Sequence, residues 1–501
     1  MMNMFYRLII LVLLIIGLSL FHTSAYAKVI VCNTMVGDNS TDNSNALNAC
    51  MKAAQSEAEK TVNIPSAASA YKVSSILTVP EGVSIIGDNG AKLNAPLIRL
   101  SNYSKLINLD FSNSIKMRAV VIGEGGPYVT GAQIRDCSFG SASWASVLVY
   151  RGNDCVFDHN TFTNGSTGQN LQILGGKRNV ITNNTITGGK TGIILKYSRT
   201  ASGGGFASQF TDNIIMHNTI GTHAEEGISI DSNPATSDQT PELEYDTVAS
   251  VSGSDITLTS ANWGPTGGAD PSYVGYSIIP ITGSAIGQYR KITVQSNATF
   301  TVESAFTGLL PGDGVSIGPV FTGNVIAYNN VSGGYSADRI SLYGNCFNNR
   351  IEYNDVNGGQ IHIKSLDRGK VSDISVTGAG GRAPCGYNLI RKNTTGNINV
   401  QYRCHDFAGN YPPYNSYGNA IVDNIITGAL IINYQLGYYN HGNTGGFSLK
   451  ETNANDCGVT ISPYAQDIGS TTLDTTDQTY TYDGNGSAPL APPSSLRIVI
   501  N

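Results

Sequence analysis

Residue types that transfer protons recur at matching places in short apolar runs of this sequence. The runs end in Lys196, Asp231, Tyr343 and Lys364, and the last one also contains His362. Each reads apolar, any residue, apolar, then the titratable residue, which is the period-2 pattern of a β-strand. Lys, His, Tyr and Asp are common general acids and bases, so these strands are candidates for carrying a catalytic site.

Parallel stacking of these strands would turn the alternate positions into outward-facing columns, because side chains alternate between the two faces of a strand. We expect one column to contain Leu148, Gln172, Ile194, Ser229, Ser341, His362 and Asn399. We expect the other to contain Tyr150, Leu174, Lys196, Asp231, Tyr343, Lys364, Gln401 and Asn433. With neighbouring strands about 4.8 Å apart, the titratable residues would share one face within about 15 Å.

Such a face suits β-elimination on a uronate-containing polysaccharide. The reaction needs a cation beside the substrate carboxylate, a base that removes the proton at C5 and an acid that protonates the leaving oxygen. We predict Lys364 or Lys196 as the base and Tyr343 or His362 as the acid. Arg403 is expected to pair with a substrate carboxylate, so the expected partner is an acidic polysaccharide.

Other polar residues near these positions have expected supporting roles. Asp231, Glu225 and Glu226 are expected either to bind Ca²⁺ or to orient a lysine, and no other cofactor is expected. The predicted contacts to substrate, besides Arg403, are Ser229, Ser341, Asn399, Gln401 and Tyr402.

Two other classes of function stay open. A glycoside hydrolase needs two carboxyl groups about 5–9.5 Å apart, which Asp231 could form with Glu226 or Glu225. A non-catalytic glycan-binding or adhesion protein would use aromatic side chains, and the 26 tyrosines include a late group: Tyr411, Tyr414, Tyr417, Tyr438 and Tyr439. Two structural alternatives stay open beside these functions: packing of the same tyrosines under a loop, and a surface ion pair of about 0–1 kcal/mol between Lys196 and Asp231.

A repeat in the body of the chain supplies the stacking. It reads Asn, apolar, Ile, two residues, Asn, and it begins at Asn179, Asn213, Asn324, Asn349, Asn388 and Asn419. A period of this length indicates a repeat architecture, and the short alternating strands between Asn and Gly turns favour a parallel β-helix over helical repeats. Asn suits such turns because it accepts left-handed backbone geometry, and we expect the stacked Asn side chains to hydrogen-bond along the solenoid.

Interruptions of the repeat predict the domain order. An amphipathic segment, 41–58, is expected to form a helix that caps the first coil, and an excess of about 80 residues between two repeats is expected to form a small β module. The predicted parts are a signal peptide 1–27, an N-terminal cap 28–60, a β-helix 61–241, an inserted module 242–318, a second β-helix part 319–440 and a C-terminal cap or tail 441–501.

Composition and the N-terminus narrow the class of protein further. The 501 residues contain 13% charged residues, 57 Gly and a net charge of −6, which argues against a disordered chain and against nucleic-acid binding. Arg7, an apolar run to Phe21 and the small residues Ala25 and Ala27 predict a secretory signal peptide. We therefore expect a secreted or periplasmic protein without a membrane anchor, with at least one disulfide, for which Cys32 and Cys50 are the expected pair.

The residues before the repeats carry a family resemblance. The segments Gly37-Asp38-Asn-Ser-Thr-Asp42, Val62-Asn-Ile-Pro65, Tyr71-Lys-Val-Ser and Val83-Ser-Ile-Ile-Gly87 resemble the N-terminal region of the pectate-lyase superfamily. The resemblance implies a right-handed parallel β-helix, in an all-β protein that acts on or binds polysaccharides. Lyase, hydrolase, uronan C5-epimerase and binding functions all occur among such proteins, and we expect the lyase.

Overall fold

The computed structural model describes the solenoid, its N-terminal cap and the inserted module. The described residues are 28–112, 116–165, 167–196, 209–232, 244–259, 273–333, 338–368, 379–380, 382–405, 416–433 and 436–452. The predicted signal peptide and most of the predicted C-terminal tail lie outside them. In the described part, no helix combines the length and the apolar character needed to cross a membrane.

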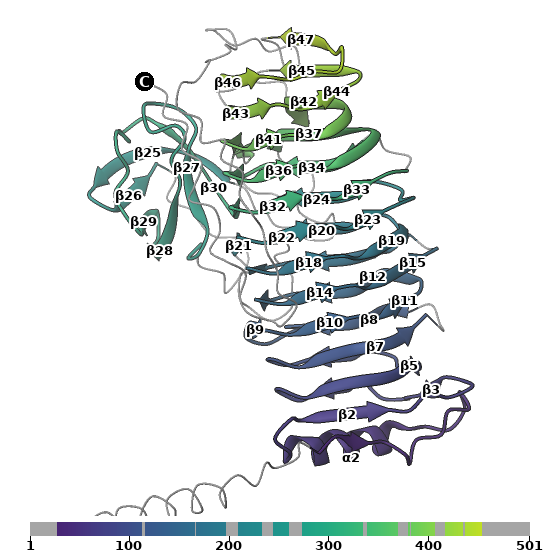
Figure 1. Ribbon diagram of the computed structural model, residues 1–501. Coiled ribbons are helices and arrows are strands. Elements are labelled where there is room, and N and C mark those ends of the chain that lie inside the picture. The colour runs from purple at the N-terminus through teal and green to yellow at the C-terminus, as the bar shows by residue number, and fades with distance from the viewer. Residues whose placement is uncertain are drawn as a thin grey trace, which may run out of the picture.

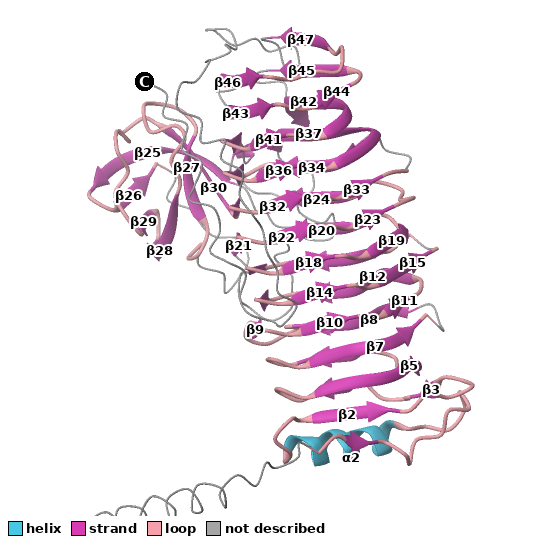
Figure 2. Ribbon diagram, viewed as in Figure 1, coloured by secondary structure: helices cyan, strands magenta, loops and turns pink. Residues whose placement is uncertain are grey.

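Parallel strands dominate this part of the chain (Figures 1 and 2), and 38 of the described strands join into one hydrogen-bonded sheet that winds along the solenoid. Each coil contributes short strands to separate faces. In one coil β14 (Val156–Asp158), β15 (Thr161–Asn164) and β16 (Gln169–Ile173) pair with β18 (Val180–Thr182), β19 (Thr185–Gly188) and β20 (Ile193–Lys196) of the next. Equivalent positions of successive coils therefore become lateral neighbours.

The face that contains β16 and β20 also carries the predicted columns. Its strands, in the order of pairing, are β4 (Leu77–Val79), β6 (Ile98–Leu100), β8 (Lys116–Ile122), β12 (Ala142–Val149), β16, β20, β24 (Ile228–Asp231), β34 (Asp338–Tyr343), β37 (Asp355–Arg368), β42 (Thr394–His405), β45 (Ala429–Asn433) and β47 (Ser448–Thr452). The parallel pairing thus continues to Thr452.

The other faces follow the same rule. One consists of β1 (Ile30–Val31), β2 (Thr61–Ile64), β5 (Ser84–Asn94), β7 (Lys105–Phe111), β10 (Gln133–Arg135), β14, β18, β22 (Ile214–Met216), β32 (Val325–Ala327), β36 (Arg350–Glu352), β41 (Leu389–Arg391), β43 (Ser416–Val422) and β46 (Leu436–His441). Shorter strands complete the coils: β11 (Ser138–Phe139), β23 (Thr219–Ile220), β33 (Asn330–Val331), β44 (Ile425–Ile426), β17 (Gly176–Lys177), β21 (Gln209–Thr211), β31 (Val320–Thr322), β35 (Cys346–Phe347) and β40 (Cys385–Gly386).

Buried asparagines connect the coils at the turns, as the repeat predicted. The Nδ2 group of Asn184 donates to Oδ1 of Asn218 at 2.9 Å, and Asn218 donates to Asn329 at 2.9 Å. A second ladder runs in the same way from Asn179 to Asn213. An unpaired buried amide is costly, so each ladder favours in-register stacking over a slipped coil.

The N-terminal cap agrees with the prediction. Helix α2 (Ser44–Gln55) buries Leu47, Cys50 and Met51 against the first coil, which covers the open end of the solenoid at the bottom of Figure 1. Cys32 and Cys50 form the expected disulfide.

The inserted module is an antiparallel unit beside the upper half of the solenoid (Figure 1). It consists of β25 (Glu244–Ser252), β26 (Asp255–Leu258), β27 (Ser277–Pro280), β28 (Arg290–Ser296), β29 (Thr299–Val302) and β30 (Gly314–Gly318), joined by β38 (Ala379–Gly380). Tyr289 fixes it to the solenoid, because its hydroxyl lies 2.9 Å from Oγ1 of Thr322 and its ring centroid 5.1 Å from that of Phe347.

The late tyrosines that the structure describes are buried. Tyr417 and Tyr438 are 1% exposed, and Tyr439 is also buried, so these three pack within the protein. Tyr411 and Tyr414 lie outside the described residues.

Candidate functional site

The strand register brings the predicted residues together. Lys196 pairs with Asp231, Asp231 with Tyr343, and Tyr343 with Lys364. Lys364 in turn pairs with Gln401 on β42. The predicted column of outward-facing residues is therefore confirmed over these five strands.

The neighbouring column is confirmed as well. Ser229 pairs with Ser341, Ser341 with His362, and His362 with Asn399. The hydroxyls of Ser229 and Ser341 lie 3.1 Å apart. Because the two columns are adjacent, His362 and Lys364 point from the same face of β37.

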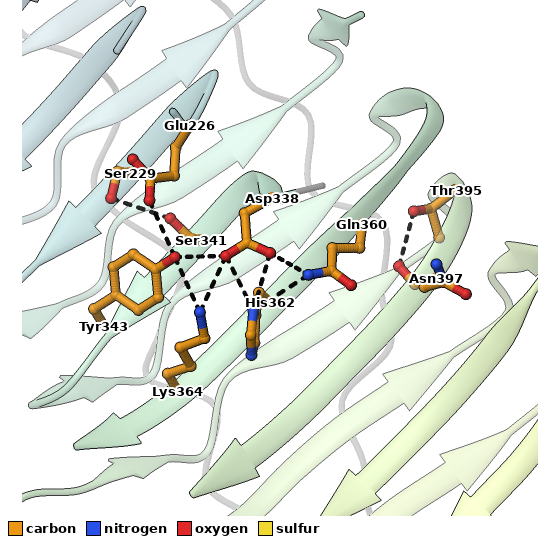
Figure 3. Close-up of polar contacts among 10 residues, drawn as sticks. All are labelled: Glu226, Ser229, Asp338, Ser341, Tyr343, Gln360, His362, Lys364, Thr395 and Asn397. Atoms are coloured by element: carbon orange, nitrogen blue, oxygen red, sulfur yellow. Dashed lines mark hydrogen bonds and ion pairs between the residues drawn. The ribbon is translucent and has the colours of Figure 1, made fainter. Parts of the chain in front are cut away.

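A carboxylate that the sequence analysis did not single out lies at the centre of this face. Asp338, at the start of β34, is contacted by Nδ1 of His362 at 3.0 and 3.2 Å and by Nζ of Lys364 at 3.1 Å. The hydroxyl of Tyr343 donates to its Oδ2 atom at 2.6 Å, and Gln360 also donates to it. Figure 3 shows these side chains converging on Asp338.

Glu226 extends this group of residues, which we call the Asp338 cluster: Glu226, Asp338, Tyr343, Gln360, His362 and Lys364. Its Oε1 atom lies 3.1 Å from the hydroxyl of Tyr343 (Figure 3). Lys364 also contacts that hydroxyl at 3.3 Å, and its Nζ lies 4.6 Å from the centre of the Tyr343 ring. The hydroxyl is thus the meeting point of two carboxyl groups and one ammonium group.

Burial and charge make the members of the cluster chemically different from one another. Burial alone would raise the pKa of Asp338, but its contacts with His362, Lys364 and Tyr343 outweigh burial and hold this pKa far below its usual range. Burial, reinforced by the charge and the hydrogen bond of Asp338, raises the pKa of Tyr343 far above its usual value. Asp338 is therefore an ionised acceptor and Tyr343 a neutral donor at ordinary pH.

Glu226 is placed differently from Asp338. Burial is the main cause that raises its pKa, and the charge of Asp231 adds to the effect. One cluster therefore contains two carboxyl groups whose pKa values are shifted in opposite directions, which is typical of acid–base sites.

Lys196 and Asp231 form an ion pair one strand away, with Nζ 3.1 Å from Oδ2. Only 19% of the lysine side chain and 10% of the aspartate side chain are exposed, so this is not a fully solvated surface pair. The pair lies next to Tyr343 in the column of strands.

The three carboxylates predicted to bind Ca²⁺ have separate neighbours. Glu225 forms an ion pair with Lys190 at 3.1 Å and is about half exposed, whereas Asp231 pairs with Lys196 and Glu226 contacts Tyr343. In the described part of the chain, no group of three or more His, Cys, Asp or Glu side chains is arranged to hold a metal ion. The calcium site stays a prediction.

The predicted substrate contacts are described unevenly. Asn399 is buried and Gln401 is partly exposed, next to His362 and Lys364 respectively. The backbones of Tyr402 and Arg403 continue β42, paired with Ser365 and Leu366. The side chains of Tyr402 and Arg403 lie outside the described part of the structure.

A break in the pairing explains why Asp338 faces the site. Asp338 pairs with Gln360 and Ile340 with the next residue, Ile361, so β34 holds one extra residue, Arg339, at this point. In regular alternation Asp338 would point the same way as Ile340, into the core. The irregularity turns it outward, as β-bulges commonly do next to functional sites, and the alternation pattern contained no signal of it.

Comparisons with known proteins agree with this architecture. A family model described as a right-handed β-helix region matches residues 97–263. Together with the parallel pairing of the strands, the match identifies the fold as a right-handed parallel β-helix. No curated protein matches the chain significantly.

Solved structures of several functional classes are similar in fold. The family 28 exopolygalacturonase of Yersinia enterocolitica is 10% identical, with 87% of this chain and 80% of that chain covered and a TM-score of 0.45. The A-module of the mannuronan C-5 epimerase AlgE4 of Azotobacter vinelandii is 12% identical over 88% and 100%, with a TM-score of 0.40. The surface adhesin PfbA of Streptococcus pneumoniae is 10% identical over 87% and 96%, with a TM-score of 0.41. At these values the similarities carry no information about the activity of this chain.

Proposed function

We propose that this protein is an exported polysaccharide lyase that cleaves a uronate-containing glycan by β-elimination at the Asp338 cluster. The observation that supports this most directly is the contact of one buried carboxylate with a histidine, a lysine and a tyrosine on the outward face of β34 and β37. Export is supported by the N-terminal pattern and by the Cys32–Cys50 disulfide, because disulfides persist in oxidising compartments.

His362 is the base in this proposal. With its proton on Nδ1, His362 donates to ionised Asp338, and Nε2 is then the nitrogen that can accept the C5 proton. An orienting carboxylate of this kind fixes the tautomer of a histidine base and stabilises the imidazolium that forms. His362 then removes the C5 proton of the uronate.

Tyr343 is the acid. It is neutral, buried and hydrogen-bonded to the same carboxylate as His362, and the two ring centres lie 6.2 Å apart. One carboxylate therefore positions the proposed base and the proposed acid. The leaving oxygen at C4 would take the proton of the tyrosine hydroxyl.

The lysines take an electrostatic role. Lys364 and Lys196 each contact a carboxylate, Asp338 and Asp231. A lysine ammonium ordinarily gives up its proton only near pH 10.4, whereas an imidazolium does so near pH 6.5, so an imidazole is the better base at neutral pH. For this reason we assign the base to His362 rather than to either lysine. A cation near the substrate carboxylate lowers the barrier to removal of the C5 proton.

A hydrolase is the second candidate, with a different pair of carboxyl groups from the one predicted. Glu226 and Asp338 contact the same tyrosine hydroxyl at 3.1 and 2.6 Å, so their nearest oxygens are at most about 5.7 Å apart. Retaining glycosidases place their carboxyl groups about 5–5.5 Å apart. Asp231, the residue predicted for this role, is instead paired with Lys196.

Incubating the protein with pectate, alginate and glycosaminoglycans distinguishes the candidates. A lyase yields an unsaturated product that absorbs in the ultraviolet, a hydrolase yields new reducing ends without that absorbance, and an epimerase changes only the sugar composition. Retention on a glycan column with no product would support a binding protein and contradict the enzyme.

Two variants test whether the measured activity depends on the Asp338 cluster. His362→Asn should lower turnover about 10²–10⁴-fold, the usual contribution of a general base. His159→Asn is the matched control, because His159 is an exposed turn residue with φ 54°, a conformation that Asn readily adopts. Equal activity of the two variants would contradict the assigned base.

A further inference from the structure

We propose that Glu226 is protonated in the resting protein and donates a hydrogen bond to the hydroxyl oxygen of Tyr343, which it resupplies with a proton after each turnover. The catalytic part of this inference rests on the proposed role of Tyr343 as the acid. The protonated state of Glu226 does not depend on it.

Counting protons around the tyrosine hydroxyl leads to this assignment. The hydroxyl has one hydrogen to give and can accept hydrogen bonds at its oxygen. Its three neighbours are Asp338 at 2.6 Å, Glu226 at 3.1 Å and the ammonium of Lys364 at 3.3 Å. The single hydrogen goes to the shortest contact, Asp338, and Lys364 donates to the oxygen.

Asp338 cannot be the protonated partner. Its two oxygens already accept from Tyr343, His362, Lys364 and Gln360. Donors on every side favour the anion, and a proton on Asp338 would have to displace one of them. The remaining contact, between Glu226 and the tyrosine oxygen, is a hydrogen bond only if Glu226 supplies the hydrogen.

The surroundings of Glu226 point the same way. The titratable groups that act on it are Asp231 on β24, the adjacent Glu225 and Tyr343 on β34. Both carboxylates oppose its ionisation, and together with burial they outweigh the contacts with its own backbone and with Tyr343, which favour the anion. Burial disfavours the anion further and is the largest cause that raises the pKa of Glu226.

Each proton that is transferred is returned to its residue within one turnover. His362 takes the C5 proton while the C4–O bond breaks and a double bond forms between C4 and C5. Tyr343 gives its proton to the departing oxygen, which leaves as a hydroxyl, and the phenolate takes the proton of Glu226. Water re-protonates Glu226 and accepts the proton from His362 after product leaves, so that no oxidant or other reactant is needed.

Infrared difference spectroscopy tests the protonated state without any substrate. We expect the wild-type protein at neutral pH to show a carbonyl band of a protonated carboxylic acid that is absent from Glu226→Gln and retained in Glu225→Gln. Glu225 is the matched control because it is adjacent in sequence and exposed. A spectrum in which Glu226→Gln removes only carboxylate bands would overturn the proposal.

Activity on pectate or alginate tests the relay. Glu226→Gln keeps a donor facing Tyr343, so KM should change little, while kcat should fall about 10²-fold because the amide cannot give up a proton. Glu226→Asp should recover part of the loss. Unchanged kcat in Glu226→Gln would refute the relay, whereas the infrared band together with no activity on any glycan would refute the proposed function and leave the protonated Glu226 standing.

Discussion

Replacing Asp338 by Asn tests the central contact of the site. The substitution keeps the shape of the side chain but removes the charge that His362, Lys364 and Tyr343 share. Removing one partner of a buried ion pair typically costs about 3–5 kcal/mol, because the other charge stays buried. We therefore expect Asp338→Asn to unfold at lower denaturant concentration and to lower the free energy of unfolding by about this amount.

The pH dependence of this loss follows from the lowered pKa of Asp338. A carboxyl group whose pKa is lower in the folded protein than in the unfolded chain stabilises the fold above its unfolded pKa of about 3.9. The contribution of the ionised carboxyl group to the difference in stability between wild type and Asp338→Asn should thus be fully present at neutral pH. It should shrink as the pH falls below about 4, toward the lower folded pKa.

Turnover gives a second and larger readout. An amide at position 338 can present its NH₂ group to His362 and favour the wrong tautomer, and the loss of an orienting aspartate of this kind costs about 10⁴-fold in kcat in a serine protease. Asp158→Asn is the matched control, since Asp158 is also buried and contacts a histidine, His159, at 2.8 Å away from the site. Activity of Asp338→Asn within a few-fold of Asp158→Asn would refute the role given to Asp338.

Three further predictions concern other parts of the molecule. Asn329→Ala should cost about 1–3 kcal/mol for each buried group left unpaired, because this residue accepts and donates within the Asn ladder; urea unfolding measures the loss. Cys137 and Cys155 should resist alkylation by iodoacetamide until the protein is denatured, because burial raises the pKa of each thiol to about 12; peptide mass mapping reads this out. Of the two roles predicted for Asp231, Glu225 and Glu226, we propose the orientation of a lysine, because Asp231 and Glu225 each contact one; a chelator should then leave turnover unchanged, and a loss restored by added Ca²⁺ would contradict this expectation.

The sequence predicted the columns of the site because two simple rules governed them. Alternation placed Lys196, Asp231, Tyr343 and Lys364 on one side of their strands, and the repeat brought those strands side by side across the insertion. Neither rule depends on the details of side-chain packing. In a parallel β-helix, residues at equivalent positions of successive repeats become neighbours in the structure.

These two rules could not predict Asp338, the residue at the centre of the site. Asp338 faces outward only because of one extra residue in β34, and a single insertion reverses the direction of a side chain in a strand. The choice between Glu225 and Glu226 was open for a related reason. Both precede β24 in an irregular segment, where no periodicity tells which of the two side chains meets Tyr343 and which meets Lys190.

The hydrogen bonds that Asp338 already accepts also bear on the choice between lyase and hydrolase. A carboxylate that acts as a nucleophile or activates a water needs an exposed lone pair and some basicity. Asp338 instead accepts from four side chains and has a strongly lowered pKa, so it is a weak base that is already engaged. It is better suited to orient His362 and Tyr343 than to attack a sugar. The proton transfers are then made by His362 and Tyr343, which favours proton abstraction and β-elimination over glycosyl transfer to water.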